Sequence, residues 1–193
     1  ATGTLQPLEQ VEVGTEVSGT IKTVAVDYND RVKEGQVLAK LDTTKLEAQV
    51  LQSEATLNYA RAKLRETQAT VAETQSKLNR FKESLELSGG KVPSQAEYDA
   101  ADAALKRAKA QEGTARADIA KAEATLKANR SDLNKATIRS PINGIVLERK
   151  VETGQTVAAS LQTPVLFKIA EDLKQMELCI GVDEADVGQV KEG

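Results

Sequence analysis

The residue types on which most enzymes depend are scarce in this chain. Its 193 residues include no histidine and a single cysteine, Cys179. This composition excludes histidine-dependent general base catalysis, histidine metal ligands and an internal disulfide. Cys179 alternates with apolar residues, so we predict a core thiol rather than a reactive one. The acidic residues Asp183, Glu184 and Asp186 have no histidine or phosphate-binding loop nearby, and we expect them to be charges at a helix N-terminus.

The sequence also argues against a phosphate-binding loop and a nucleic-acid-binding surface. The glycines before Lys91 do not form a phosphate-binding loop, because Val92 stands where such a loop needs serine or threonine. A net charge of −3 leaves no basic footprint for nucleic acid. No run of eighteen apolar residues is present, so we predict no membrane-spanning segment within these residues. We therefore expect a protein without enzymatic activity.

The elements that organise the chain are two long heptad repeats, at 43–87 and 94–136. A sustained seven-residue apolar repeat predicts a coiled-coil seam, and residues 88–93 between the repeats contain two glycines and a proline. The sequence therefore predicts a helical hairpin about 65 Å long. The seam positions are Val50, Leu57, Leu64, Val71, Leu78 and Leu85 in the first arm, and Tyr98, Leu105, Glu112, Ile119, Leu126 and Leu133 in the second.

An antiparallel hairpin gives these positions a simple register, in which facing residue numbers add up to 183. The rule pairs Leu85 with Tyr98, Leu78 with Leu105, Leu64 with Ile119, Leu57 with Leu126, and Val50 with Leu133. It also places Val71 opposite Glu112, which is followed by Gly113. A charge and a glycine in the seam mark the softest point of the hairpin, and we expect the Glu112 carboxylate to extend into solvent.

The segments on either side of the hairpin have the residue pattern typical of β-strands. Strand-like runs with β-branched residues occupy 11–42 and 137–170. Within them, 32–37 and 151–157 share a pattern of valine, two polar residues, glycine and glutamine, which indicates two halves of one β domain. The fold class is therefore α+β, with the hairpin inserted into a split domain. A further strand begins near Gln175, and a short helix is expected at 183–190.

The order of these phrases resembles a known family. Residues 19–21 (GTI), 32–42 (VKEGQVLAKLD) and 138–146 (IRSPINGIV), placed around a long hairpin, are similar to membrane fusion proteins, the HlyD-like periplasmic adaptors. Residues 1–5 and 11–19 are closest to the MacA-type adaptors of tripartite ABC efflux pumps for macrolide export. The resemblance implies a split lipoyl-like β-sandwich with an inserted antiparallel coiled-coil hairpin and the truncated start of a β-barrel domain.

The domain boundaries expected from this resemblance are as follows: an N-terminal barrel or linker segment at 1–10, lipoyl-like halves at 11–42 and 137–170, the hairpin at 43–136 with its tip at 86–94, and the barrel at 171–193. The resemblance implies an adaptor that bridges an inner-membrane ABC-type transporter to an outer-membrane TolC-like channel, with six copies in the assembled pump. It also implies a periplasmic location with an inner-membrane anchor. We expect that an export segment has been removed before Ala1.

The resemblance carries over to particular residues. The family's hairpin tip has an arginine, a leucine four residues later and a serine seven residues after that. Here Arg80 and Ser94 match the ends of this pattern, the leucine position falls on Ser84, and Leu85 or Leu87 must substitute for it. The gating loop of MacA-type adaptors corresponds to 158–164, where Gln162 matches the second of two glutamines and Leu161 replaces the first. An apolar ring from Leu161 is the alternative to a glutamine gate.

Other functions remain open at this point. A lipoyl-like fold raises the alternative of an acyl carrier modified on Lys45, although a lysine in the first turn of a helix, with Asp42 or Thr43 as N-cap, is not displayed as a turn lysine is. An adaptor for an RND-type pump is another alternative. A coiled-coil scaffold unrelated to transport is the third, but such a scaffold does not need the split β domain.

Overall fold

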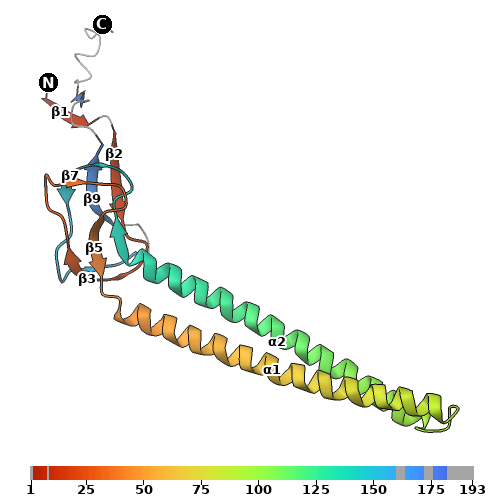
Figure 1. Ribbon diagram of the computed structural model, residues 1–193. Coiled ribbons are helices and arrows are strands. Elements are labelled where there is room, and N and C mark those ends of the chain that lie inside the picture. Colours follow the sequence, from red (N-terminus) through yellow and green to blue (C-terminus); the bar gives the residue numbers. More distant parts are fainter. Residues whose placement is uncertain (1, 8, 160–163, 172–175, 182–193) are drawn as a thin grey trace, which may run out of the picture. The chain divides into compact units, whose positions relative to one another are not determined.

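The computed structural model describes residues 2–7, 9–159, 164–171 and 176–181 (Figure 1). The chain forms two compact units: residues up to 43 together with those from 132 onward, and residues 44–131. This arrangement confirms the predicted α+β class with an inserted helical hairpin. The elements in chain order are β1 (Thr2–Pro7), β2 (Gln10–Gly14), β3 (Gly19–Val24), β4 (Arg31–Val32), β5 (Val37–Leu41), α1 (Thr44–Leu87), α2 (Gln95–Lys135), β6 (Thr137–Arg139), β7 (Gly144–Arg149), β8 (Thr156–Val157), β9 (Val165–Ala170) and β10 (Met176–Gly181).

The β unit contains two four-stranded sheets, each built from both sides of the hairpin insertion. Their strand orders are β2-β9-β7-β4 and β6-β5-β3-β8. The apolar side chains of these strands form a closed core, in which Phe167, Leu38 and Val146 are completely buried. Since neither half of the chain supplies a complete sheet, the two halves fold as one domain.

The repeated valine, glycine and glutamine pattern forms the same turn twice. Gly35 and Gly154 both have a positive φ, of 78° and 87°, a conformation that glycine adopts without steric cost. In each turn the following glutamine side chain accepts a hydrogen bond of 3.0 Å from a backbone N–H three residues earlier: Gln36 from Lys33, and Gln155 from Glu152. The predicted half-repeats are therefore confirmed as equivalent local structures.

Each of these turns is hydrogen-bonded to the opposite half of the domain. The Gly35 N–H donates to the Ser140 carbonyl at 2.8 Å, and the Ser140 N–H donates to the turn at 2.9 Å. In the second turn the Gly154 N–H donates to the Ile21 carbonyl, and the Ile21 N–H donates back, both at 2.8 Å. We call these four bonds the reciprocal clamp. The clamp has a local two-fold character, because each half of the sequence supplies one turn and one segment that bonds the turn of the other half.

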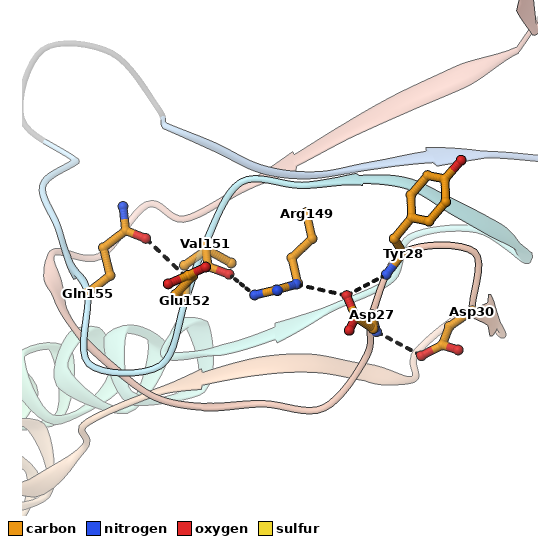
Figure 2. A network of polar contacts seen from close by, with 7 residues as sticks. All are labelled: Asp27, Tyr28, Asp30, Arg149, Val151, Glu152 and Gln155. Atoms are coloured by element: carbon orange, nitrogen blue, oxygen red, sulfur yellow. Dashed lines mark hydrogen bonds and ion pairs between the residues drawn. The ribbon is translucent and has the colours of Figure 1, made fainter.

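A side-chain network adds a further link between the halves (Figure 2). Arg149, at the end of β7, donates from Nε to Asp27 Oδ1 at 3.0 Å and from Nη1 to the Val151 carbonyl at 2.7 Å. The backbone N–H of Tyr28 and the Arg149 guanidinium together hold the pKa of Asp27 below its usual value. The network thus fixes the loop before β4, in the first half, to a strand of the second half.

The chain leaves and re-enters the β unit at adjacent points. In the β5–β6 pair, Lys40 lies opposite Thr137, and the Leu41 N–H donates to the Ala136 carbonyl at 2.9 Å. Lys135 also forms an ion pair with Glu16. The expected proximity of the two ends of the insertion is therefore confirmed by backbone pairing.

The helical unit consists of two antiparallel helices, α1 and α2 (Figure 1). Their observed ends lie within one residue of the predicted 43–87 and 94–136. Two apolar clusters confirm the register. One contains Leu57 and Leu126 and the other Leu78 and Leu105, the pairs that the rule predicts. Neither described helix has an apolar stretch long enough to cross a membrane.

A separate two-stranded sheet joins β1 and β10, with Thr2 opposite Gly181 and Pro7 opposite Met176. The strand expected near Gln175 is confirmed as β10, which includes Cys179. The helix expected at 183–190 lies outside the described residues.

Gly144 provides a test of the packing between β7 and β9, two paired strands of the second half of the β unit. A Cβ added there would lie 2.2 Å from the Ala170 carbonyl oxygen, whereas a Cβ on Gly19 would meet only Leu41 side-chain atoms, at 3.7 Å. We expect Gly144→Ala to lower the unfolding free energy by about 1–3 kcal/mol, as overpacking does. Gly19→Ala is the matched control and should leave the melting temperature by scanning calorimetry nearly unchanged. Equal melting temperatures for the two variants would contradict this packing.

Candidate functional site

The best candidate site is the tip of the hairpin, where α1 gives way to α2. The first helix ends at Leu87, and Gly89 and Gly90 follow with φ of 61° and 88°. The Gly90 N–H donates to the Leu85 carbonyl at 2.8 Å, which satisfies one of the last carbonyls of the helix. The Ser88 hydroxyl bonds the carbonyl and the N–H of Val92, both at 3.0 Å, and so closes the loop. The tip is therefore an ordered turn.

The start of α2 is fixed by a capping box. The Ser94 hydroxyl and backbone N–H both donate to Glu97 Oε2, at 2.8 and 2.9 Å, and the Glu97 N–H donates to the Ser94 hydroxyl at 3.4 Å. These bonds from Ser94 hold the pKa of Glu97 below its ordinary value. Ser94 therefore caps the second helix. A serine followed by glutamate three residues later predicts a capping box, so this spacing is the signal in the sequence for the role of Glu97.

The predicted docking residues differ in how much they offer to a partner. Arg80 is exposed, and its guanidinium has no hydrogen bond or ion pair with any residue that the structure describes. Ser94 is exposed as well, but its hydroxyl is engaged in the cap. Leu85 is half-buried, whereas Leu87 is 90% exposed and Val92 is 60% exposed. Of the two leucines that the sequence offers for the apolar contact, only Leu87 presents its whole side chain.

The two edges of the hairpin are chemically different. One edge carries ion pairs between the arms, Arg61 with Glu123 at 3.2 Å and Arg130 with Glu54 at 2.6 Å. Since an α-helix turns by 100° per residue, the residues that line a groove of about 550 Å³ lie on the opposite edge of the hairpin. Tyr59, on the rim of this groove, is 74% exposed. The groove is lined by Gln49, Gln52, Ser53, Thr56, Tyr59, Ala60, Lys63, Asp118, Lys121, Ala122, Thr125 and Asn129.

The remaining sequence candidates do not converge on a second site. Lys45 lies in the first turn of α1 and is exposed, so it is not displayed on a turn between strands as a carrier lysine is. Leu161 and Gln162, the candidate gate residues, lie outside the described residues. Across the part of the chain that the structure describes, no three acidic or cysteine side chains are grouped to bind a metal ion.

Comparison with known proteins identifies what this architecture is similar to. Residues 9–169 match the family model described as the barrel-sandwich hybrid domain of RND membrane fusion proteins. Among solved structures, the crystal structure of MacA from Actinobacillus actinomycetemcomitans superposes with a TM-score of 0.85 at 30% identity. That match covers 99% of this chain and 58% of the other.

Two curated relatives align over the whole chain. Macrolide export protein MacA of Escherichia coli O157:H7 is 35% identical over 100% of this chain and 51% of its own length. Pyoverdine export membrane fusion protein PvdR of Pseudomonas aeruginosa is 32% identical over 100% of this chain and 48% of its own length. The chain thus spans about half the length of the curated relatives it matches.

The capping box makes a specific prediction about pH. Because Ser94 lowers the pKa of Glu97 in the folded state, the carboxylate stabilises the cap above its unfolded pKa of about 4.3, and this contribution is lost as the pH falls through the lowered folded value. Ser94→Ala should raise the pKa of Glu97 toward its ordinary value and increase fraying of the first turn of α2. An NMR titration of the Glu97 carboxyl carbon checks this, with Ser76→Ala, an exposed serine within α1, as control. An unshifted Glu97 in Ser94→Ala would contradict the cap.

Proposed function

This chain belongs to the membrane fusion protein family, and we propose that it is the hairpin-bearing part of a periplasmic adaptor in a tripartite efflux system. In this proposal the adaptor bridges an inner-membrane transporter and an outer-membrane channel of the TolC type. The whole protein is held in the periplasm by an inner-membrane anchor. No catalytic step is assigned to any residue.

The observation that carries the proposal is the chemistry at the end of the hairpin. Two helices of 44 and 41 residues are joined by an ordered turn. Leu87 and Val92 expose apolar side chains there, and Arg80, two turns before the end of α1, exposes a guanidinium with no partner among the described residues. Exposed leucine and valine at the turn, with an arginine two helical turns away, are well suited to a partner helix end, because such an end offers both apolar surface and backbone carbonyls. The tip is therefore assigned to the outer-membrane channel.

Each tip residue has a distinct role in this proposal. Arg80 donates hydrogen bonds to carbonyl or carboxylate groups of the channel. Leu87 supplies the apolar contact that the resemblance assigns to the leucine of the tip pattern, with Leu85 behind it in the seam. Ser94 caps α2 and faces the channel beside the cap. In the domain organisation that the resemblance implies, lipoyl-like halves at 11–42 and 137–170 hold the end of the hairpin opposite the tip.

The transporter is proposed to be of the ABC type, on the resemblance to MacA-type adaptors. The description of the matching family as RND membrane fusion proteins favours an RND-type pump as the second candidate. Co-purification of the full-length adaptor with each class of transporter distinguishes the two. The relatives are named for different cargoes, a macrolide and a pyoverdine, so no cargo is assigned to this chain. Assembly is proposed as a ring of six copies.

The docking assignment is tested by pull-down of this chain against a purified TolC-type channel. We expect Arg80→Asp and Leu87→Ala each to weaken binding roughly tenfold, as truncation of a central interface residue does, and Ser94→Ala to weaken it less. The matched controls are Arg65→Asp and Leu51→Ala, which change an exposed arginine and an exposed leucine of α1 away from the tip. Binding that is undiminished in Arg80→Asp and Ser94→Ala, or reduced equally in the controls, would sink the tip assignment.

A further inference from the structure

The seam of the hairpin changes character between its two apolar clusters. On the side nearer the tip, Leu78 and Leu105 are 3% and 5% exposed, and on the other side Leu57 and Leu126 are 6% and 7% exposed. Toward the middle of the seam the apolar residues are only half-buried: Ile119 packs against the Leu57 cluster, Val71 against the Leu78 cluster, and Leu64 lies between them. Between Leu57 and Leu78 the buried residues of α1 are Ala60 and Thr67, and only alanines are buried on the facing part of α2. The apolar seam is thus thinnest in its middle.

A carboxylate occupies this thin part of the seam. The Glu112 side chain is only 17% exposed, so the expectation that it extends into solvent is wrong. Its Oε1 instead accepts a hydrogen bond of 2.7 Å from Arg116, one turn later on the same helix. This bond from Arg116, with help from Gln68 on α1, holds the pKa of Glu112 below its ordinary value, although burial acts in the opposite direction. A charged group therefore replaces the apolar side chain that would lock the arms together.

The glycine that follows has no steric reason to be there. A Cβ added to Gly113 would meet nothing within 4 Å, and its φ is not positive. Alanine would fit without strain and is the better helix former. Gly113 thus leaves the backbone of α2 locally easier to deform, at the level where the seam is weakest.

Threonine hydroxyls compete for backbone carbonyls in the same region. On α1, Thr67, Thr70 and Thr74 donate to carbonyls of the preceding turn at 2.8, 3.2 and 2.8 Å. On α2, Thr114 donates to the Ala110 carbonyl at 3.2 Å. Such bonds slightly destabilise helices and often accompany bending. Ser53, Thr56 and Thr125 make them outside this region as well, so they add to its weakness without marking it alone.

We propose that the hairpin contains a built-in joint, formed by residues 64–74 of α1 and 109–116 of α2, at which the half carrying the tip bends relative to the rest of the hairpin. Both helices remain continuous through the joint, so it is a compliant region rather than a break. The two clusters on either side each move as a unit. The joint lets the tip change direction without disturbing the packing of the tip itself.

Hydrogen exchange of the chain alone tests the joint without any channel. Amides of 67–71 and 110–115 should exchange about tenfold faster than those beside Leu57 and Leu78, because local opening there disrupts little apolar packing. The double variant Glu112→Leu/Gly113→Ala fills the seam and should slow exchange in the joint about tenfold, toward the rate of its flanks. Lys127→Leu, at an exposed position of α2, is the control and should leave the joint unchanged.

Spin labels at positions 51 and 82 of α1, in a Cys179→Ser background, report bending directly. The pair straddles the joint at about 46 Å along the helix. We expect a broad distance distribution in the native sequence and a narrower one in the double variant. Uniform exchange along the hairpin, or a distribution that the double variant leaves unchanged, would overturn the joint. A failure of channel binding in the pull-down would leave these measurements unaffected.

Discussion

The reciprocal clamp is the interaction on which the rest of the structure depends. Four backbone hydrogen bonds join the turn at Gly35 to Ser140 and the turn at Gly154 to Ile21, so each half of the β unit completes the other. Positive φ at the two glycines orients the N–H groups that make these bonds, a geometry that a side chain would strain. Because the halves can only close together, β5 and β6 must pair, and the ends of the insertion are held side by side. A long hairpin can leave and return at one place only under this condition.

The two helices of the hairpin are held together with few large apolar side chains. Aromatic residues make up only 3% of the chain. The seam uses leucines where it is tightly closed and buried alanines throughout, at Ala101, Ala108, Ala115 and Ala122. Small side chains allow the two backbones to approach, and cross-arm polar contacts, such as Asn129 to the Ser53 hydroxyl at 2.5 Å, fix the register. Surface ion pairs contribute little stability on their own, so the closing of the arms depends mostly on the two apolar clusters.

Much of this architecture could be predicted from the sequence because it rests on periodicity. The seven-residue repeat gave the helices, their ends and the facing pairs, and the glycine-glutamine pattern gave the two equivalent turns. The clamp could not be predicted, since backbone hydrogen bonds carry no side-chain signature. Which leucine is exposed for the apolar contact, Leu85 or Leu87, depends on the direction of each side chain in the last turn of α1. Side chains two residues apart on an α-helix point about 200° apart, and the sequence alone does not show which of them faces solvent. The ion pair of Glu112 with Arg116 follows an i,i+4 spacing that is visible in the sequence, but the burial of the Glu112 side chain depends on how the two arms pack, which the sequence does not show.

Because its two edges differ, the hairpin is asymmetric from side to side, unlike a coiled coil with two equivalent edges. An edge sealed by ion pairs and an edge hollowed by a groove cannot exchange places when parallel copies stand next to one another. Neighbours so arranged meet through two different surfaces, which is a heterologous contact, and every copy repeats it in the same sense. A ring of parallel hairpins would therefore have a direction: each copy would present its ion-paired edge to one neighbour and its grooved edge to the other, in the same sense all the way round.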